Sequence, residues 1–257
     1  MASKEVLKIW GARGTIPSPG EKYLRYGGNT PCLTVSIGPD EHLILDCGSG
    51  LRLFGKSLGP LEPGSRRRFH VLLSHYHFDH IEGLPYFMPL FDADSTFVIH
   101  GLESNGRTAR DAIEGLIRPP YFPVSIAGSP AQIQYARAGV ELRIGEVRAE
   151  CVPLNHPDGS LAWRLTKGSK RVVYATDHEH GLDPIDKALE RFAEGADLLI
   201  YDATYVPAEY ESLRRGWGHS TWYAAVALAR SARVKTLALF HHHPDHSDDE
   251  LERYHFP

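Results

Sequence analysis

The sequence has few cysteines, no excess of one charge and no long apolar run. Its three cysteines show no paired spacing, so no disulfide framework is indicated. The 28 basic and 32 acidic side chains give a formal net charge of −4, which provides no general attraction for nucleic acid or an anionic membrane. No apolar run approaches the roughly 18 residues that span a bilayer, and residues 1–10 lack a secretion-signal pattern. This composition predicts a cytoplasmic protein without membrane contact.

The sequence also indicates the environment of the three cysteines and of one short basic run. Cys32 and Cys151 lie in apolar, β-prone runs and Cys47 ends one, so we expect all three to be buried thiols. The run 66–68 consists of three arginines in a stretch with Gly and Ser. We interpret it as a solvated loop, with contact to a polyanion as the alternative.

Apolar periodicity predicts a single domain, 1–257, built from short strands and helices. Strands are predicted at 6–10, 32–37, 42–45, 69–73, 96–100, 132–135, 141–152, 160–175, 197–205 and 234–240. Helices are predicted at 51–58, 108–117, 183–195 and 221–232 and at the C-terminus, and 81–91 is predicted as helix or loop. Each half gives strands first and helices after, so the economical arrangement is α+β: two packed sheets with helices outside, a four-layer αββα sandwich.

Local signals mark several boundaries. Asp183, directly before a proline, is expected as a helix N-cap, and Ser220 or Thr221 caps the next helix. Ser247-x-x-Glu250 predicts a capping box that opens the terminal helix. Residues 167–170, Lys-Gly-Ser-Lys, predict a hairpin turn. The proline-rich, aromatic run 118–123 cannot be regular, and we interpret 118–127 as a lid or contact loop, with a plain surface loop as the alternative.

The strongest chemical signal follows the predicted strand 69–73. Four side chains that bind divalent metals, His75, His77, Asp79 and His80, occupy six consecutive positions. In an extended segment His75 and His77 project to the same side, and a turn beyond them can direct the other two toward a second point. Imidazole and carboxylate ligands suit zinc, and also manganese or iron. The segment therefore predicts a site for divalent metal.

This His-x-His-x-Asp-His pattern resembles that of the metallo-β-lactamase superfamily, and the resemblance extends over nearly the whole chain. It implies that Asp46 orients the metal-binding loop without binding metal. It also implies that His156 is a ligand and that Asp177 bridges two metals. The last ligand that the resemblance implies is His241, which directly follows an apolar run, with His242 as the alternative.

The resemblance thus implies a dinuclear site with an open position on each metal. The implied ligands are His75, His77 and His156 on one ion, Asp79, His80 and His241 on the other, and Asp177 on both. Asp245 and His246 are then expected to hold ligand rings by hydrogen bonds. Zinc is the first expectation for both ions, with manganese or iron as alternatives.

Motifs later in the sequence indicate which branch of the superfamily the chain resembles. His219-Ser220-Thr221 resembles the His-Ser-Thr motif of tRNA 3′-end endonucleases (tRNase Z) and of phosphoribosyl cyclic phosphodiesterase. This implies that His219 assists phosphodiester cleavage, with a structural role as the alternative, and Asp202 resembles the acidic residue that precedes this histidine. The segments 10–17 and 25–30 resemble the same group and are expected to be turns near the metal loop.

No long basic insertion is present, which favours a small phosphodiester over tRNA. The expected function is hydrolysis of a small cyclic or nucleotide-type phosphodiester by a metal-bridging hydroxide. Asp79 would orient the nucleophile and His219 would donate a proton to the leaving oxygen. A lactone or ester hydrolase on the same site is the first alternative, and a non-enzymatic ligand-binding protein is the second. Family resemblance also suggests a homodimer, and no strong nucleic-acid signal is present.

Overall fold

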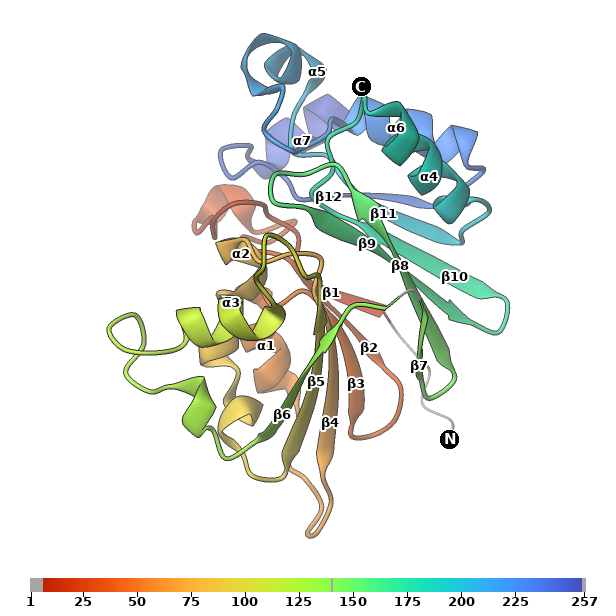
Figure 1. Cartoon of the computed structure of the whole chain (residues 1–257). Helices are drawn as coiled ribbons and strands as arrows, with labels where there is room; N and C mark the ends of the chain where they lie inside the picture. Colours follow the sequence, from red (N-terminus) through yellow and green to blue (C-terminus); the bar gives the residue numbers. More distant parts are fainter. Residues whose placement is uncertain (1–6, 140, 256–257) are drawn as a thin grey trace. The chain divides into compact units, whose positions relative to one another are not determined.

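The computed structural model describes residues 7–139 and 141–255, so Val6, the predicted start of the first strand, lies outside the described part. The chain divides into two compact units. Unit 1 contains the residues up to Gly11 and Asn29–Ala138, and unit 2 contains Ala12–Gly28 and the residues from Gly139 onward. Each unit contains one six-stranded mixed sheet (Figure 1).

The sheet of unit 1 follows chain order, from β1 to β6. Its strands are β1 (Leu7–Gly11), β2 (Cys32–Ser36), β3 (Glu41–Leu45), β4 (Arg67–Leu72), β5 (Ser95–Gly101) and β6 (Gln132–Arg137). The first three strands are antiparallel, and β3 to β6 are parallel. Because parallel strands end at the same edge, Asp46, directly after β3, and Ser74, two residues after β4, meet there.

Short helices cover this sheet and supply part of its core. They are α1 (Gly50–Ser57), α2 (Phe78–Ile81) and α3 (Ala109–Leu116), with 3₁₀ turns at Leu84–Tyr86, Met88–Phe91 and Ile126–Gly128. Phe69 on β4 stacks on Phe97 of β5 with ring centroids 4.8 Å apart, and Phe54 of α1 packs edge-on against Phe69. This aromatic core fixes the strands that carry the metal-loop residues.

The sheet of unit 2 also follows chain order, from β7 to β12. Its strands are β7 (Glu141–Ile144), β8 (Val147–Leu154), β9 (Ser160–Lys167), β10 (Lys170–Ala175), β11 (Leu198–Asp202) and β12 (Leu237–Phe240). β7 to β10 are antiparallel, and β10 to β12 are parallel. The carboxyl ends of the parallel strands place Asp177, Asp202 and His241 at one edge.

Helices α4 (Asp183–Ala193) and α6 (Trp222–Ser231) pack on one face of the second sheet (Figure 1). Leu189 of α4 and Ala225 of α6 are fully buried in the apolar cluster that they form with the strands. The remaining helices of unit 2 are a 3₁₀ turn at Glu21–Tyr23, α5 (Pro207–Glu209), a π-helical turn at Tyr210–Arg214, and α7 (Asp248–His255).

The α+β class and the order of most elements are confirmed. The hairpin at Gly168 is confirmed, Thr221 caps α6, and Ser247 and Glu250 form the predicted capping box. The prediction that Asp183 is an N-cap is wrong. Leu182 has the extended backbone of the cap, and Asp183 lies inside the first turn, where its charge favours the helix dipole.

Other boundaries also differ. The predicted strand 141–152 is a hairpin that turns at Gly145, which has a φ of 57°. The strands predicted at 197–205 and 234–240 are shorter, and α5 with its π-helical turn was not predicted. Turn glycines inside apolar runs and helices without a clear apolar period explain these differences.

The prediction that the basic run 66–68 is a solvated loop is wrong. Arg67 and Arg68 lie in β4, and Arg67 is buried, with its guanidinium donating to the carbonyl of Gly59. The prediction for the cysteines is confirmed for Cys32 and Cys47, which are fully buried, while Cys151 is half-buried.

The segment 118–123 is irregular, as predicted. Phe122 packs against Tyr86 and Phe91, and Tyr121 is exposed. A role as lid or contact loop stays a prediction. Among residues 7–139 and 141–255, no helix combines the length and apolar character needed to cross a membrane.

Candidate metal and catalytic site

In unit 1, Asp46 holds the start of the histidine-rich loop. Its backbone has a φ of 56°, and its side chain is fully buried. Oδ1 accepts a hydrogen bond from the N–H of Ser74 (2.7 Å), and Oδ2 accepts one from the Ser74 hydroxyl (2.7 Å). Oδ2 also lies 2.8 Å from Nδ1 of His80. Asp46 therefore fixes both ends of the segment 74–80.

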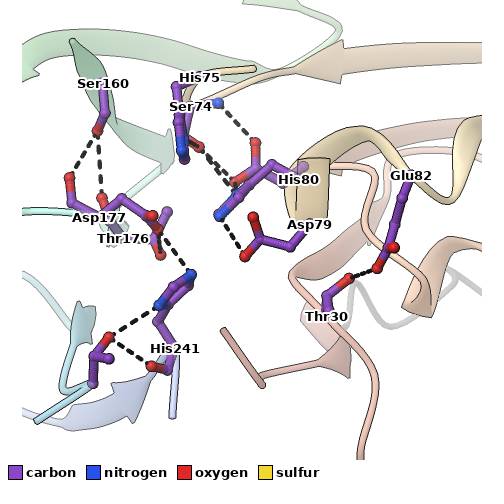
Figure 2. A network of polar contacts seen from close by, with 12 residues as sticks. Thr30, Ser74, His75, Asp79, His80, Glu82, Ser160, Thr176, Asp177 and His241 are labelled. Carbon is purple, nitrogen blue, oxygen red and sulfur yellow. Dashed lines mark hydrogen bonds and ion pairs between the residues drawn. The ribbon is translucent and has the colours of Figure 1, made fainter. Parts of the chain in front are cut away.

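These contacts determine which ring nitrogens face outward from the loop. Nδ1 of His75 lies 3.0 Å from the Ser74 hydroxyl, and Nδ1 of His80 is held by Asp46. Nε2 of His80 lies 3.4 Å from Oδ2 of Asp79 (Figure 2). With Nδ1 engaged, Nε2 is the atom that these imidazoles present to a metal.

The histidine rings of the loop gather in one place. The ring centroid of His75 lies 4.5 Å from that of His77 and 4.3 Å from that of His80. His75 and His80 are buried and His77 is exposed. The loop brings together all four side chains that the sequence predicted as ligands in this segment.

Close backbone packing supports the loop from behind. The N–H of Cys47 donates to the carbonyl of His80 (2.7 Å), and the N–H of Gly83 donates to the carbonyl of Cys47 (2.8 Å). A Cβ on Gly48 would lie 2.3 Å from the carbonyl oxygen of Asp79. Glycine is required there because the turn after β3 and the helix α2 are in backbone contact.

A second polar network adjoins this turn. The hydroxyl of Thr30 donates to Oε1 of Glu82 (2.7 Å; Figure 2). It also accepts from the N–H of Ser49 (2.8 Å). Burial raises the pKa of Glu82, while the bond from Thr30 acts in the opposite direction. The network joins part of the motif 25–30 to α1 and to the residue after α2, which gives Thr30 a structural role.

In unit 2, Asp177 presents its two carboxylate oxygens to different imidazoles. Oδ1 lies 3.3 Å from Nε2 of His241 (Figure 2). Oδ2 lies 3.7 Å from Nε2 of His156. The carboxylate is buried, and Oδ1 also accepts a hydrogen bond from the Thr176 hydroxyl. This divergent arrangement is suited to a carboxylate that bridges two ions.

The two imidazoles beside Asp177 also have Nδ1 engaged by the protein, as His75 and His80 do in unit 1. Nδ1 of His156 donates to the carbonyl of Gly218 (2.7 Å), and Nδ1 of His241 lies 3.0 Å from the hydroxyl of Thr204. A Cβ on Gly14 would lie 2.3 Å from the ring of His241, so the segment 12–17 packs its backbone against that ring. Both rings again present Nε2.

His242, the alternative to His241, has a different environment. Its backbone N–H donates to Ala12 and its carbonyl accepts from Gly14. Its ring centroid lies 6.3 Å from that of Tyr26. Within unit 2, His241 and not His242 is the residue beside Asp177.

His219 is held by Asp202. Nδ1 of His219 lies 2.8 Å from Oδ2 of Asp202, whose Oδ1 accepts from the backbone N–H groups of Thr204 (3.0 Å) and Ser220 (3.1 Å). Burial acts to raise the pKa of Asp202, but the charge and hydrogen bond of His219 outweigh it and lower the pKa. The contact with Asp202 therefore orients the ring of His219.

His219 also stacks on a predicted ligand. Its ring lies 4.8 Å from that of His241, at an angle of 16°. Ligand atoms of Asp177, Asp202, His219 and His241 all lie within 4.8 Å of one another, so this group could itself hold an ion. The carboxylate of Asp202 is already occupied by His219 and by two backbone amides.

The expected roles of Asp245 and His246 are wrong. Nε2 of His246 lies 2.9 Å from Oε1 of Glu209, and the side chain of Asp245 is exposed. Thr204 and Gly218 hold the ligand rings of unit 2 instead. Thr204 lies two residues after Asp202, a spacing at which its N–H and hydroxyl can both donate to the acidic side chain. Nothing in the sequence alone marks the carbonyl of Gly218 as an acceptor.

Comparison with known proteins gives the family. Residues 42–242 match the family described as the beta-lactamase superfamily domain. A ribonuclease Z from Bradyrhizobium diazoefficiens is 24% identical, with 95% of this chain and 92% of that protein covered.

Solved structures share the fold. The metallo-β-lactamase fold protein YhfI from Bacillus subtilis has a TM-score of 0.69 at 23% identity, covering 97% of this chain and 91% of that one. A diphosphatase from the PhnP family has a TM-score of 0.71 at 18% identity, with the same shares covered.

The chain therefore belongs to the beta-lactamase superfamily and has the metallo-β-lactamase fold, with two mixed sheets flanked by helices. It is a metal-dependent hydrolase. The resemblance found from the sequence is confirmed.

Proposed function

We propose that this protein hydrolyses phosphodiesters at a site for two divalent ions. The proposed ligands are those implied by the sequence resemblance: His75, His77, Asp79, His80, His156, Asp177 and His241. All seven lie inside the region that matches the superfamily.

One observation carries the proposal: imidazoles of both units have Nδ1 engaged by the protein. In unit 1 the partners are Ser74 and Asp46, and in unit 2 they are Gly218 and Thr204. Engaging Nδ1 fixes the tautomer and the ring orientation of a metal ligand. Nitrogen and carboxylate donors in this combination fit zinc, manganese or iron, and zinc is our first choice.

When bound, two such ions activate water and neutralise charge on phosphoryl oxygens. The chain supplies the remaining functions. His219, whose Nδ1 faces Asp202, can deliver a proton from Nε2 to the leaving oxygen. The ionised Asp202 stabilises the protonated ring before that transfer. In this proposal Asp79, in the first turn of α2, orients the attacking water.

The substrate class rests on the His219 pair and on the relatives. The pair supplies an acid for an alkoxide leaving group, and its His-Ser-Thr motif resembles that of enzymes that cleave phosphodiesters. Relatives named ribonuclease Z weigh against the expectation that the chain carries no strong nucleic-acid signal. We still favour a small cyclic or nucleotide-type phosphodiester, because the chain has no long basic insertion and a net charge of −4.

A substrate panel tests this function. We expect the metal-loaded protein to cleave an aryl phosphodiester and cyclic nucleotides, and to cleave phosphomonoesters and a β-lactam weakly or not at all. The rates would be measured as kcat/KM on one preparation, with precursor tRNA and a lactone included. Faster turnover of the lactone than of every phosphodiester would favour an ester hydrolase, and preference for precursor tRNA would assign the RNA substrate.

A further inference from the structure

The segment that carries His219 is held by a side chain outside the proposed ligand set. The carboxylate of Glu179 accepts three hydrogen bonds. Oε1 accepts from the N–H of Gly216 (2.7 Å) and the hydroxyl of Tyr210 (3.0 Å), and Oε2 accepts from the N–H of Gly218 (2.8 Å). Charge-assisted hydrogen bonds from the N–H groups of Gly216 and Gly218 restrict the backbone of this loop strongly.

The loop needs such restraint. Gly216 and Gly218 have φ values of 83° and 85°, in the left-handed region that glycine adopts readily. Glycine loses more conformational freedom on ordering than other residues. Trp217, between them, is exposed, but its N–H donates to the carbonyl of Arg214 (3.2 Å) and its ring lies 4.4 Å from the Arg214 guanidinium. These contacts stay within the segment, whereas the bonds from Glu179 join Gly216 and Gly218 to a distant part of the chain.

Glu179 is also joined to the segment of His156. Its N–H donates to the carbonyl of Asn155 (2.8 Å), and its own carbonyl accepts from Nδ2 of Asn155 (2.8 Å). Gly218, fixed by Glu179, supplies the carbonyl that accepts from Nδ1 of His156. A Cβ on Gly218 would lie 2.3 Å from that nitrogen, so the loop is in direct contact with the ring.

We propose that Glu179 is a positioning residue of this site. By fixing the amides of Gly216 and Gly218, it holds the backbone before His219, whose ring Asp202 contacts, and it orients His156 through the Gly218 carbonyl. Glu179 itself acts through these residues and not on substrate. The part of this inference that concerns His219 rests on the proposed function, whereas the part that concerns the loop and His156 does not.

Glu179→Gln is the informative change. The amide has the size of the carboxylate but replaces one acceptor oxygen with an N–H donor, so one loop amide would face a donor. We expect kcat for a phenyl phosphodiester at saturating metal to fall about 10- to 100-fold, the range for residues that orient metal-site groups. Ion affinity, measured against a competing chelator, should fall by up to about tenfold through His156.

A double-variant cycle separates positioning from general damage. In a His219→Ala background, Glu179→Gln should change kcat by less than about threefold, because residues that act as a unit are non-additive. An equal loss of kcat in both backgrounds would overturn the link to His219. If the wild-type protein cleaves only a lactone, the proposed function fails, but the same cycle can be measured with that substrate.

Hydrogen exchange gives a readout that needs neither metal nor activity. In the metal-free protein, Glu179→Gln should speed exchange in the peptide containing 214–219 while leaving the strands of unit 2 protected. Tyr210→Phe removes one bond to Glu179 and should have a smaller effect. Glu211→Gln, which removes an exposed charge paired with Arg215, is the matched control and should have none. Unchanged exchange and unchanged kcat in Glu179→Gln would overturn the proposal.

Discussion

His219→Ala is expected to lower kcat by about 10²-fold or more on a phosphodiester with an alkoxide leaving group. The ring is held through Nδ1 by Asp202 at 2.8 Å, which leaves Nε2 as the nitrogen that acts on the leaving oxygen. The fold and the ion content should remain those of the wild type, because His219 is outside the proposed ligand set. Steady-state kinetics and elemental analysis on the same preparation check both expectations.

The defect should depend on the leaving group. Nitrophenolate leaves without protonation, so His219→Ala should affect a nitrophenyl ester much less than an alkyl ester. Asp202→Asn should reproduce this dependence in weaker form, because it removes the charge that stabilises the protonated ring. His70→Ala is a matched loss of an imidazole, since His70 contacts Glu41 on the neighbouring strand. Loss of an ion from His219→Ala would show that the group Asp177, Asp202, His219 and His241 binds metal.

Asp177→Asn is expected to have the largest effect of any single change. The amide keeps the size of the side chain but lacks the charge to join two cations, and its two heteroatoms are no longer equivalent. We expect loss of at least one ion and a fall in activity on the order of 10³-fold, because metal stabilisation contributes several kcal/mol and about 1.4 kcal/mol corresponds to tenfold. Asp183→Asn, an exposed carboxylate on α4, is the control that should retain both. Two tightly bound ions in Asp177→Asn would remove its bridging role.

The sequence predicted the positions of most strands because their apolar runs are short and bounded by turn residues. The histidine-rich loop was found for the same reason: its ligands are adjacent in the chain, and they follow a buried strand. Boundaries failed where a glycine turns inside an apolar run, as at Gly145, or where Asp183 occupies the first helical turn instead of the cap.

The residues that orient the site could not be found in this way. Glu179 accepts from the N–H of Gly218, and the carbonyl of Gly218 accepts from His156. These contacts join residues that are far apart in the sequence, and neither residue type signals such a contact. Asp202 and His219 were found only through a resemblance, and their direct contact required the structure. Sequence pattern thus identifies groups that bind metal more readily than the groups that hold them in place.

The most direct test of the account is a titration of metal-free protein with a divalent ion. Phosphodiester cleavage and the number of ions bound per chain would be measured at each step, first with zinc and then with manganese. We predict almost no cleavage in chelator, little with the first ion, and full activity only as the second ion binds. Full activity with one ion per chain, or activity that persists in chelator, would contradict the two-ion phosphodiesterase.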